Sequence, residues 1–333
     1  MSTHCVEIIE LESVEPHGNA DAIEVASIRG WRCCVRKGQF KKGDRCIHIE
    51  PDYVVPLSHP AFSFLGKDGE KTHRVRARRL RGAISHGLVI PVPSELSGLP
   101  TGSNVMQALG IERWQPPEHF STGGKYARGP SGLYCPKFDV ENYQKYPNLF
   151  KAGEPVLAIE KMHGSSSRYV FAKSPDDGQF VQYVGSRVNW YQDDEQNVWW
   201  RAFHKYPGIG MWCQANPECV LYGEVFGNVQ SLKYGAGKND IFFAAFAVLY
   251  RNTWLDYRHW FPTVMHYSIP LPPLFYQGPF DAALIADLAE GDSRWPGASH
   301  MAEGLVVTPE RERVDAEAGR VCLKMVSSRY LAS

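Results

Sequence analysis

The stretch Ile159-Glu160-Lys161-Met162-His163-Gly164-Ser165-Ser166 decides the fold of the larger part of this chain. An apolar run ends at Lys161, and a His-Gly turn follows after one intervening residue. The pattern predicts a lysine at the mouth of a sheet, with its ammonium group beside a tight glycine turn. A lysine becomes a nucleophile when burial or a neighbouring cation lowers its pKa. The tract also fits a solvated lysine at a strand end, so the rest of the sequence has to decide.

Five further tracts follow this lysine in order along the chain. They are Gly185-Ser186-Arg187, Leu221-Tyr222-Gly223-Glu224, Phe243-Ala244-Ala245-Phe246-Ala247-Val248, Glu303-Gly304-Leu305-Val306-Val307, and Lys324 with Ser327 and Ser328. Together with the first tract they resemble motifs I, Ia, III, IIIa, IV and V of the covalent nucleotidyltransferases. The histidine in the first motif is typical of RNA ligases. Six motifs in the correct order are not expected by chance.

The first hundred residues carry short β-type runs separated by Pro, Gly, Asn and Asp, a spacing typical of a small barrel or sandwich. The runs are residues 6–14, 22–28, 31–35 and 45–49. Pro16-His17-Gly18-Asn19-Ala20-Asp21 followed by Ile23-Glu24-Val25 resembles the opening hairpin of tRNA-binding OB domains. With the tract Phe138-Asp139-Val140-Glu141-Asn142, these features resemble RNA ligases of the Deinococcus type, which carry an OB domain before the ligase domain.

The resemblance implies an α+β fold. A nucleotidyltransferase domain of antiparallel sheets flanked by helices, an ATP-grasp-like ligase fold, follows an all-β OB-fold barrel. Strands that pair mostly as hairpins favour antiparallel sheets. Periodicity predicts strands at residues 156–160, 168–172, 180–185, 220–225, 241–249 and 304–307, and helices at 198–206 and 281–288. The expected domains are an OB-fold domain at 1–100, a linker or wrapping segment at 101–135 and an adenylyltransferase domain at 136–333.

The chemistry that this resemblance implies begins at Lys161. Its Nζ attacks the α-phosphorus of ATP, expels pyrophosphate and carries AMP, which then passes to a 5′-phosphate end. A 3′-hydroxyl displaces AMP and seals the strand. Lys324 is expected to contact the α-phosphate, and Glu303 to hold Mg²⁺ or Mn²⁺, because hard cations prefer carboxylate oxygens and water. The alternatives are a solvated strand lysine for Lys324 and a buried ion pair for Glu303.

Other residues are assigned to the nucleotide by the same resemblance. Glu224 is expected to accept hydrogen bonds from the ribose hydroxyls, with a buried ion pair as the alternative. Phe246 is expected to stack on adenine, or else to be plain core, and Glu160 to take the adenine amino group. Arg187 is expected to contact the nucleotide or a 5′-phosphate through charge-assisted bonds, and His163 to orient the loop or cap the turn. The full nucleotide-binding set is Glu160, Met162, Ser166, Arg187, Glu224, Phe246, Glu303 and Lys324.

Two positions depart from the family pattern. Ala247 stands where motif IIIa usually has Asp, which removes a structural hydrogen bond rather than a catalytic group. Motif V holds the single Lys324 where many ligases have two lysines, which leaves open how the nucleotide phosphate is fully neutralised. No C-terminal OB domain of the DNA-ligase kind is expected.

A locally basic run occupies residues 67–82, where Arg74, Arg76 and Arg78 alternate with apolar residues. A strand here places three guanidinium groups on one face. Arginine forks suit phosphate oxygens, so we expect these three arginines, together with Arg187, to contact nucleic acid. The alternative is a solvated edge strand guarded by charge.

The composition narrows the setting. The 36 basic residues balance 36 acidic ones, so a nucleic-acid site has to be a local patch. The 8 cysteines form no CxxC pair and Met1-Ser2-Thr3-His4 opens no signal peptide, which favours a cytoplasmic protein with reduced thiols. No apolar run is long enough to cross a bilayer. The expected partner is RNA, as a nicked or broken duplex or an RNA/DNA hybrid, bound by a monomer away from membranes.

Three functions compete. DNA ligases and capping guanylyltransferases usually carry Lys-x-Asp-Gly and a C-terminal OB domain, neither of which is found in this sequence. A non-catalytic RNA-binding protein on a decayed ligase scaffold is disfavoured by the intact Lys161, Glu224, Glu303 and Lys324. The sequence therefore favours an ATP-dependent RNA ligase. By resemblance, such an enzyme prefers ends bridged in a duplex, with RNA on the 3′-hydroxyl side.

Overall fold

A computed structural model of the chain describes residues 5–66, 69–114 and 124–332. These fall into two compact units. Of the described residues, the C-terminal unit contains 124–142 and 148–327, and the N-terminal unit contains 5–66, 69–114, 143–147 and 328–332. The predicted linker tract Gln115-Pro116-Pro117 and Ser121-Thr122-Gly123 lies outside the described residues, as do Met1–His4 and Lys67 and Asp68 of the basic run.

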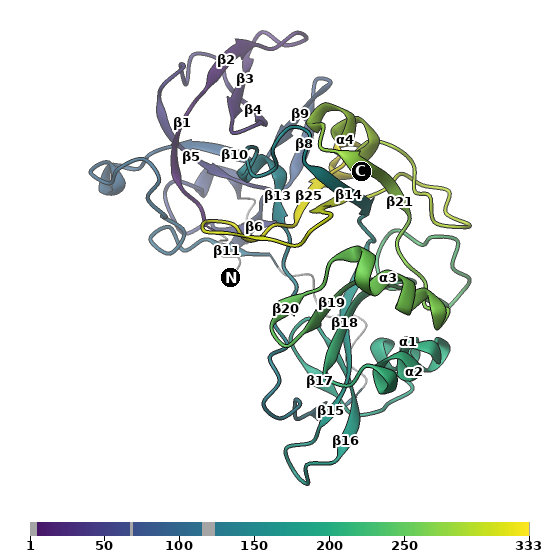
Figure 1. The fold of residues 1–333 in the computed structure, drawn as a ribbon. Helices are drawn as coiled ribbons and strands as arrows, with labels where there is room; N and C mark the ends of the chain where they lie inside the picture. Colours follow the sequence, from purple (N-terminus) through teal and green to yellow (C-terminus); the bar gives the residue numbers. More distant parts are fainter. Residues whose placement is uncertain (1–4, 67–68, 115–123, 333) are drawn as a thin grey trace. The chain divides into compact units, whose positions relative to one another are not determined.

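The larger sheet of the C-terminal unit has seven strands in the order β12-β17-β16-β15-β18-β19-β20, all paired antiparallel. Their bounds are Tyr126–Ala127 (β12), Trp190–Tyr191 (β17), Phe180–Ser186 (β16), Gly164–Lys173 (β15), Cys219–Gly227 (β18), Ile241–Tyr250 (β19) and Thr253–Trp254 (β20). The predicted strands at 168–172, 180–185, 220–225 and 241–249 are the inner strands of this sheet (Figure 1).

A second sheet has five strands in the order β13-β25-β22-β14-β21. Their bounds are Glu141–Asn142 (β13), Leu323–Val326 (β25), Gly304–Pro309 (β22), Pro155–Glu160 (β14) and Leu274–Pro279 (β21). The β13–β25 pair is parallel and the other pairs are antiparallel, so the expected antiparallel sheets hold apart from this edge. A small hairpin of β23 (Val314–Asp315) and β24 (Gly319–Arg320) follows β22.

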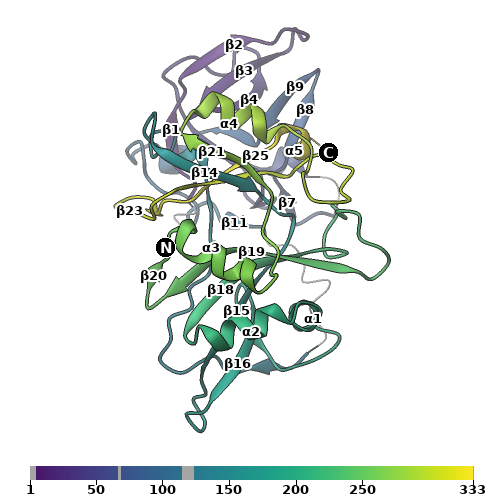
Figure 2. The same ribbon diagram turned by 45° about the vertical axis from the view of Figure 1, so that its right-hand side comes forward.

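Three helices pack on one face of the seven-stranded sheet, and a fourth packs on the five-stranded sheet (Figures 1 and 2). The first three are α1 (Val198–Lys205), α2 (Gly208–Ala215) and α3 (Tyr257–His266), and the fourth is α4 (Ala282–Ala289). The predicted helices at 198–206 and 281–288 correspond to α1 and α4, whereas α2 and α3 were not predicted individually. Among the helices of the described residues, none is long and apolar enough to cross a membrane.

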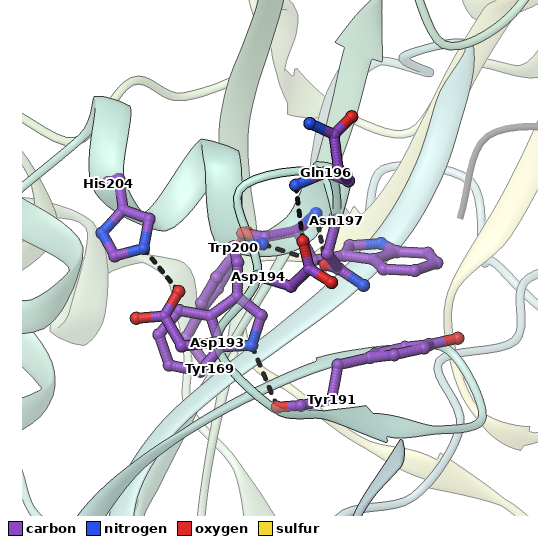
Figure 3. A network of polar contacts seen from close by, with 9 residues as sticks. Tyr169, Tyr191, Asp193, Asp194, Gln196, Asn197, Trp200 and His204 are labelled. Atoms are coloured by element: carbon purple, nitrogen blue, oxygen red, sulfur yellow. Dashed lines mark hydrogen bonds and ion pairs between the residues drawn. The ribbon is translucent and has the colours of Figure 1, made fainter. Parts of the chain in front are cut away.

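The start of α1 shows why the chain turns into a helix at this point. The buried Asn197 side chain accepts hydrogen bonds from the backbone N–H groups of Trp199 and Trp200, which satisfies two donors of the first turn. The Trp200 indole donates to the Tyr191 carbonyl at 2.9 Å and so ties the helix to strand β17 (Figure 3). This packing covers one face of the seven-stranded sheet with helices.

Alternation along β18 places one glutamate on the other face of this sheet. Leu221 and Val225 belong to the core beneath the helices, whereas Tyr222 and Phe226 belong to clusters on the opposite side. Successive side chains of a strand point to opposite faces. Glu224 therefore shares its face with Tyr222 and Phe226, away from the helices.

The N-terminal unit is built of short antiparallel strands. Their bounds are Ile8–Glu10 (β1), Ser13–Pro16 (β2), Ile23–Ile28 (β3), Trp31–Arg36 (β4), Arg45–Ile49 (β5), Tyr53–Pro56 (β6), Thr72–Arg74 (β7), Ala77–Leu80 (β8), Ala83–His86 (β9), Leu88–Pro91 (β10) and Glu112–Arg113 (β11). The predicted run at 6–14 divides into β1 and β2, because the buried Leu11 pairs through its backbone with Gly43 and Asp44. Short 3-10 helices are η1 (Ser63–Leu65), η2 (Ser94–Leu96) and η3 (Tyr143–Lys145), and helix α5 spans Ser328–Leu331.

The predicted single strand through Arg74, Arg76 and Arg78 is wrong. Strand β7 ends at Arg74 and pairs with β6, whereas β8 starts at Ala77 and pairs with β9. The chain changes partner strand between them, so the three arginines do not form one row. Within the segment predicted as a linker, Val105, Leu109 and Ile111 are buried in the core of this unit.

Candidate active site

Lys161 follows strand β14, and Glu303 precedes the adjacent strand β22. The Lys161 backbone N–H donates to the Gly304 carbonyl at 2.9 Å, which fixes the lysine beside the start of β22. Its Nζ donates to Glu303 Oε1 at 2.7 Å, and the side chains are 25% and 10% exposed. The predicted nucleophile is thus a partly accessible amine held by a buried carboxylate, and not a solvated lysine at a strand end.

The glycine of the turn is required by a close approach. A Cβ atom at Gly164 would lie 2.2 Å from the Val225 carbonyl oxygen, so only glycine lets β15 meet β18 here. The register then places Ser165 opposite Val225 and Ser166 opposite Glu224. Ser166 is therefore a direct neighbour of Glu224, and its buried Oγ has no hydrogen-bond partner among the described residues.

The two glutamates of the site have pKa values that move in opposite directions. Burial, reinforced by the negative charge of Glu303, raises the pKa of Glu224 to about 8, although Lys161 opposes this. Burial would also raise the pKa of Glu303, but the charges of Lys161 and His163, together with the hydrogen bond from Lys161, lower it to about 2. At neutral pH the site therefore holds an ionised Glu303 and a largely protonated Glu224.

Lys324 lies on the same face of the five-stranded sheet as Ile159, which precedes Lys161 by two residues. It pairs with Val306, which in turn pairs with Ile159, two residues before Lys161. Directly opposite residues in a sheet lie on one face. Lys324, Val306 and Ile159 are partly buried, in contrast to their fully buried neighbours on the strands. The sheet thus directs both lysines of the predicted site to one side.

Glu160 and Met162 flank the nucleophile and point into the protein. Glu160 Oε2 accepts a hydrogen bond from the Arg294 backbone N–H at 2.9 Å, and its Oε1 is buried without a hydrogen-bond partner in the described part of the chain. Burial raises the pKa of Glu160. Met162 packs in a buried cluster with Phe226 and Tyr234.

Phe246 lies in an aromatic cluster on the same side of the sheet as Glu224. A bulge in the β18–β19 register leaves it as the extra residue between Ala245 and Ala247. Its ring centroid is 4.6 Å from that of Phe138, and Phe138 also contacts Tyr222 and Trp254. Ala247, where the related motif has Asp, is buried in this cluster and packs as a small apolar side chain.

Arg187 follows strand β16 and forms an ion pair with Asp139. Its Nε is buried and has no hydrogen-bond partner among the residues that the structure describes. Phe138 and Asp139 therefore contact two predicted nucleotide-binding residues, Phe246 and Arg187. The sequence of this tract alone does not indicate a role in the site.

The predicted nucleic-acid residues of the N-terminal unit differ in their surroundings. Arg74 pairs with Asp52 at 2.6 Å, and its guanidinium lies 3.1 Å from the centre of the Trp114 ring. Arg76 and Arg78 are exposed. Arg74 is thus engaged within its own unit.

Two residues around the first motif were missed by sequence analysis. The Tyr234 hydroxyl accepts a hydrogen bond from the His163 backbone N–H at 2.8 Å, and His300 Nε2 accepts one from the Tyr234 N–H at 3.2 Å. Neither lies in a quoted motif. Each reaches the first motif through tertiary contacts, so no local pattern in the sequence indicates it.

Comparisons with known proteins agree with this arrangement. A family model described as RNA ligase matches residues 154–326, and one described as an OB-fold domain matches residues 5–92. Among solved structures, Naegleria gruberi RNA ligase with PPi is 25% identical, with a TM-score of 0.80, over 98% of this chain and 97% of that one. A lysine-to-methionine variant of that ligase with AMP and Mn gives 24% identity and a TM-score of 0.82, over 98% of each chain. No curated protein matches significantly.

These matches confirm the expected fold, an α+β nucleotidyltransferase domain preceded by an OB-fold domain. The family match covers every strand of the two larger sheets except the edge strands β12 and β13, and it includes Lys161, Glu224, Glu303 and Lys324. Because the match covers more than half of the sequence, the chain belongs to the RNA ligase family.

Proposed function

We propose that this RNA ligase uses ATP and joins a 3′-hydroxyl end to a 5′-phosphate end through an AMP bonded to Lys161. The observation that carries the proposal is the 2.7 Å contact between Lys161 Nζ and the ionised Glu303, beside the protonated Glu224. An amine held in one orientation is prepared for attack, and positioning supplies a large part of the rate in such reactions. Structural relatives from Naegleria gruberi, solved with ATP, AMP and Mn, support ATP as the substrate.

In the first step Lys161 Nζ forms a bond to the α-phosphorus, and the bond from this phosphorus to pyrophosphate breaks. Only the neutral amine has a lone pair for attack, so one proton leaves the Lys161 ammonium before the attack and a second leaves as the N–P bond forms. Glu303 is a weak base because its pKa is about 2. Its role is therefore to orient the amine, while the protons pass to water or to the departing pyrophosphate.

The nucleotide contacts of the proposal use the groups around Lys161. Glu224, as a protonated carboxyl beside Ser166, is suited to the ribose hydroxyls, and the unpartnered Glu160 Oε1 is suited to the adenine amino group. Lys324 is assigned to the α-phosphate because it shares a sheet face with the approach to Lys161. Phe246 is assigned to adenine, Met162 to the floor beneath it, and Arg187 to a phosphate.

A divalent cation, Mg²⁺ or Mn²⁺, fits this donor set. The buried Glu303 Oε2 makes no hydrogen bond within the described residues and has only the 3.4 Å approach of His163 Nδ1. When both are ionised, Glu224 and Glu303 repel one another, and a bound cation would relieve this repulsion. The described residues contain no group of three or more His, Cys, Asp or Glu side chains placed to hold a metal, so phosphate and water would complete the shell, as Mg²⁺ prefers. When bound, the cation neutralises charge on the phosphates.

The later steps follow from the chemistry of the first. AMP moves from Lys161 to a 5′-phosphate, and the 3′-hydroxyl then attacks that phosphate and releases AMP. We assign the end-joining chemistry to the adenylyltransferase domain (136–333), and we assign contacts with a nicked duplex or RNA/DNA hybrid to the OB-fold domain (1–100). RNA on the 3′-hydroxyl side is the preferred substrate in this proposal.

The test is direct labelling of the protein. Incubation with α-labelled ATP and Mg²⁺ or Mn²⁺ should give an acid-stable band at 37.5 kDa, and Lys161→Ala should abolish it. Label from GTP instead would indicate a capping activity. No label from either nucleotide, under any metal or pH, contradicts the proposal. Nicked duplexes with RNA or DNA on the 3′-hydroxyl side then test the sugar preference.

A further inference from the structure

The loop between β18 and β19 returns to the turn that carries Lys161. Its Tyr234 is fully buried, and the hydroxyl accepts a hydrogen bond from the His163 backbone N–H at 2.8 Å. The Tyr234 ring packs edge-on against Phe226 at 4.8 Å and lies in one cluster with Met162. On the solvent side, His163 Nε2 lies 3.1 Å from the Ser231 hydroxyl. The same loop thus contacts both residues that follow the nucleophile.

A close backbone contact between Gly235 and Gly297 fixes the position of Tyr234. Tyr234 and Gly235 have φ angles of 53° and 76°, in the left-handed region that favours glycine. A Cβ atom at Gly235 would lie 2.5 Å from the Gly297 carbonyl oxygen. The loop is therefore pressed against the segment 291–302. A non-glycine residue in this conformation is uncommon and persists only where its surroundings enforce it.

His300 joins the loop between β18 and β19 to the segment 291–302. Its Nε2 accepts a hydrogen bond from the Tyr234 N–H at 3.2 Å, and its Nδ1 lies 2.7 Å from the Met301 carbonyl oxygen. Because a carbonyl only accepts, Nδ1 carries the hydrogen and Nε2 has the free lone pair. The ring also packs edge-on against the Tyr234 ring at 4.6 Å.

The segment 291–302 holds the other side of the nucleophile. The Arg294 backbone N–H donates to Glu160 Oε2 at 2.9 Å, and the Ser293 N–H donates to the His300 carbonyl at 3.0 Å. Glu160 and His163 therefore lie on either side of Lys161 in the sequence. The segment 291–302 holds Glu160, and the loop between β18 and β19 holds His163. The contact between Tyr234 and His300 joins these two segments.

We propose that Tyr234 and His300 are positioning residues, which hold the turn after Lys161 so that Lys161 Nζ is oriented towards the α-phosphorus. The proposal rests on the proposed function, since it concerns the adenylylation step. A misplacement of about 1 Å can cost about 100-fold in rate. The effect is confined to the step in which the lysine reacts. Sealing of a 5′-adenylylated RNA, in which AMP is already on the end, does not use that attack.

The experiment compares Tyr234→Phe with Tyr169→Phe, which also removes the hydroxyl of a fully buried tyrosine in the same unit. Tyr169 donates to the Trp199 carbonyl at 3.1 Å, beneath the helices and away from Lys161. We expect Tyr234→Phe to lower the single-turnover rate of protein adenylylation roughly 10- to 100-fold. The ATP concentration that gives the half-maximal rate should change about twofold or less, because the substitution removes no contact with bound ATP. Tyr169→Phe should adenylylate as the wild type does.

Sealing of pre-adenylylated RNA separates positioning from general damage. Tyr234→Phe should seal it within about twofold of the wild-type rate, because ground-state binding and the later chemistry remain. His300→Ala should reproduce the adenylylation defect, and His300→Gln, whose amide oxygen can accept from the Tyr234 N–H, should restore most of it. Equal losses in both steps, or an unchanged adenylylation rate, overturn the proposal. A wild-type protein that takes no label overturns the proposed function and this inference with it.

Discussion

Glu224 and Glu303 are the same residue type, and their surroundings drive their pKa values apart. Lys161 touches Glu303 directly, whereas at Glu224 burial outweighs the charge of the lysine, and the negative charge of Glu303 adds to the effect of burial. Sites that divide acid and base roles commonly separate pKa values in this way. The stability of the protein should therefore depend on pH through these two residues in opposite senses.

Replacement of Glu224 by Gln should stabilise the protein, and more so as the pH rises. Between about pH 4.5 and 8 the folded protein keeps a proton on Glu224 that the unfolded chain releases, so the free energy of unfolding falls as pH increases. Gln has no such proton. Thermal melts in metal-free buffer at pH 5, 6.5 and 8 should show the advantage of Glu224→Gln growing across the series. A constant difference would contradict the raised pKa.

Replacement of Glu303 by Gln should have the opposite sign. The folded pKa of Glu303 is lowered to about 2, so its contribution to stability is complete above the unfolded value of about 4.5 and is lost as the pH falls towards 2. Glu303→Gln should therefore melt below the wild type at pH 7, and the gap should close between about pH 4.5 and pH 2. A gap that persists at the acid end would show that the Lys161–Glu303 pair is not its source.

At the scale of secondary-structure elements, glycine lets two strands of the site meet. Gly164→Ala would place a methyl group 2.2 Å from the Val225 carbonyl and force β15 away from β18. Overpacking of this kind costs about 1–3 kcal/mol. Because the same contact aligns Ser166 with Glu224, protein adenylylation should fall together with the denaturant midpoint. Gly178→Ala is a control, since that glycine, with a φ of 74°, has open space around its Cβ position. It should lower the midpoint without a loss of adenylylation beyond the unfolded fraction.

Helix α1 offers an independent check on the packing of the seven-stranded sheet. Asn197→Ala removes the side chain that caps the Trp199 and Trp200 N–H groups (Figure 3). Loss of a cap of this type costs about 0.5–2 kcal/mol. The free energy of unfolding should fall by that amount in a urea titration, whereas Asn197→Asp should retain most of it. An unchanged value for the alanine variant would mean that the cap contributes nothing here.

Elements with strong local periodicity could be predicted from the sequence. Helix α1 has aromatic residues at helical spacing, and α4 follows Asp281, which caps it by accepting a hydrogen bond from the Leu284 N–H. Helices α2 and α3 contain glycine and proline, which weaken that signal, and they form because they cover the sheet. The arginine strand was predicted wrongly because alternation cannot show a change of partner strand.

The residues of the candidate site also fall into those that the sequence could predict and those that it could not. Lys161, Glu224, Glu303 and Lys324 lie in short tracts with a recognisable pattern, so their chemistry could be predicted, although their roles stay predictions. Tyr234 and His300 are 66 residues apart and meet only through tertiary structure. Asp139 likewise belongs to the site only through its ion pair with Arg187, which lies far along the chain. Residues that support a site through such contacts leave little trace in a single sequence.

At the scale of the whole molecule, the balanced charge of 36 basic and 36 acidic residues makes RNA binding a matter of local patches. In the OB-fold domain Arg74 is paired with Asp52 and stacked on Trp114, so it is already engaged. Arg76 and Arg78 are exposed and form no ion pair or hydrogen bond with another described residue. We therefore expect these two arginines, more than Arg74, to contact phosphates.

The prediction concerns how RNA affinity depends on salt. Each phosphate that a protein neutralises contributes about 0.9 to the slope of log affinity against log salt on a duplex. Arg76→Ala with Arg78→Ala should therefore weaken binding of a nicked duplex and flatten this slope by about 2. Fluorescence anisotropy across a salt series measures it. Arg74→Ala should change the slope by less than one such contact and lower the melting temperature instead. Because ATP alone labels Lys161 in the proposed mechanism, the double variant should still form the adenylate. A slope identical to the wild type would place the RNA on another surface of the molecule.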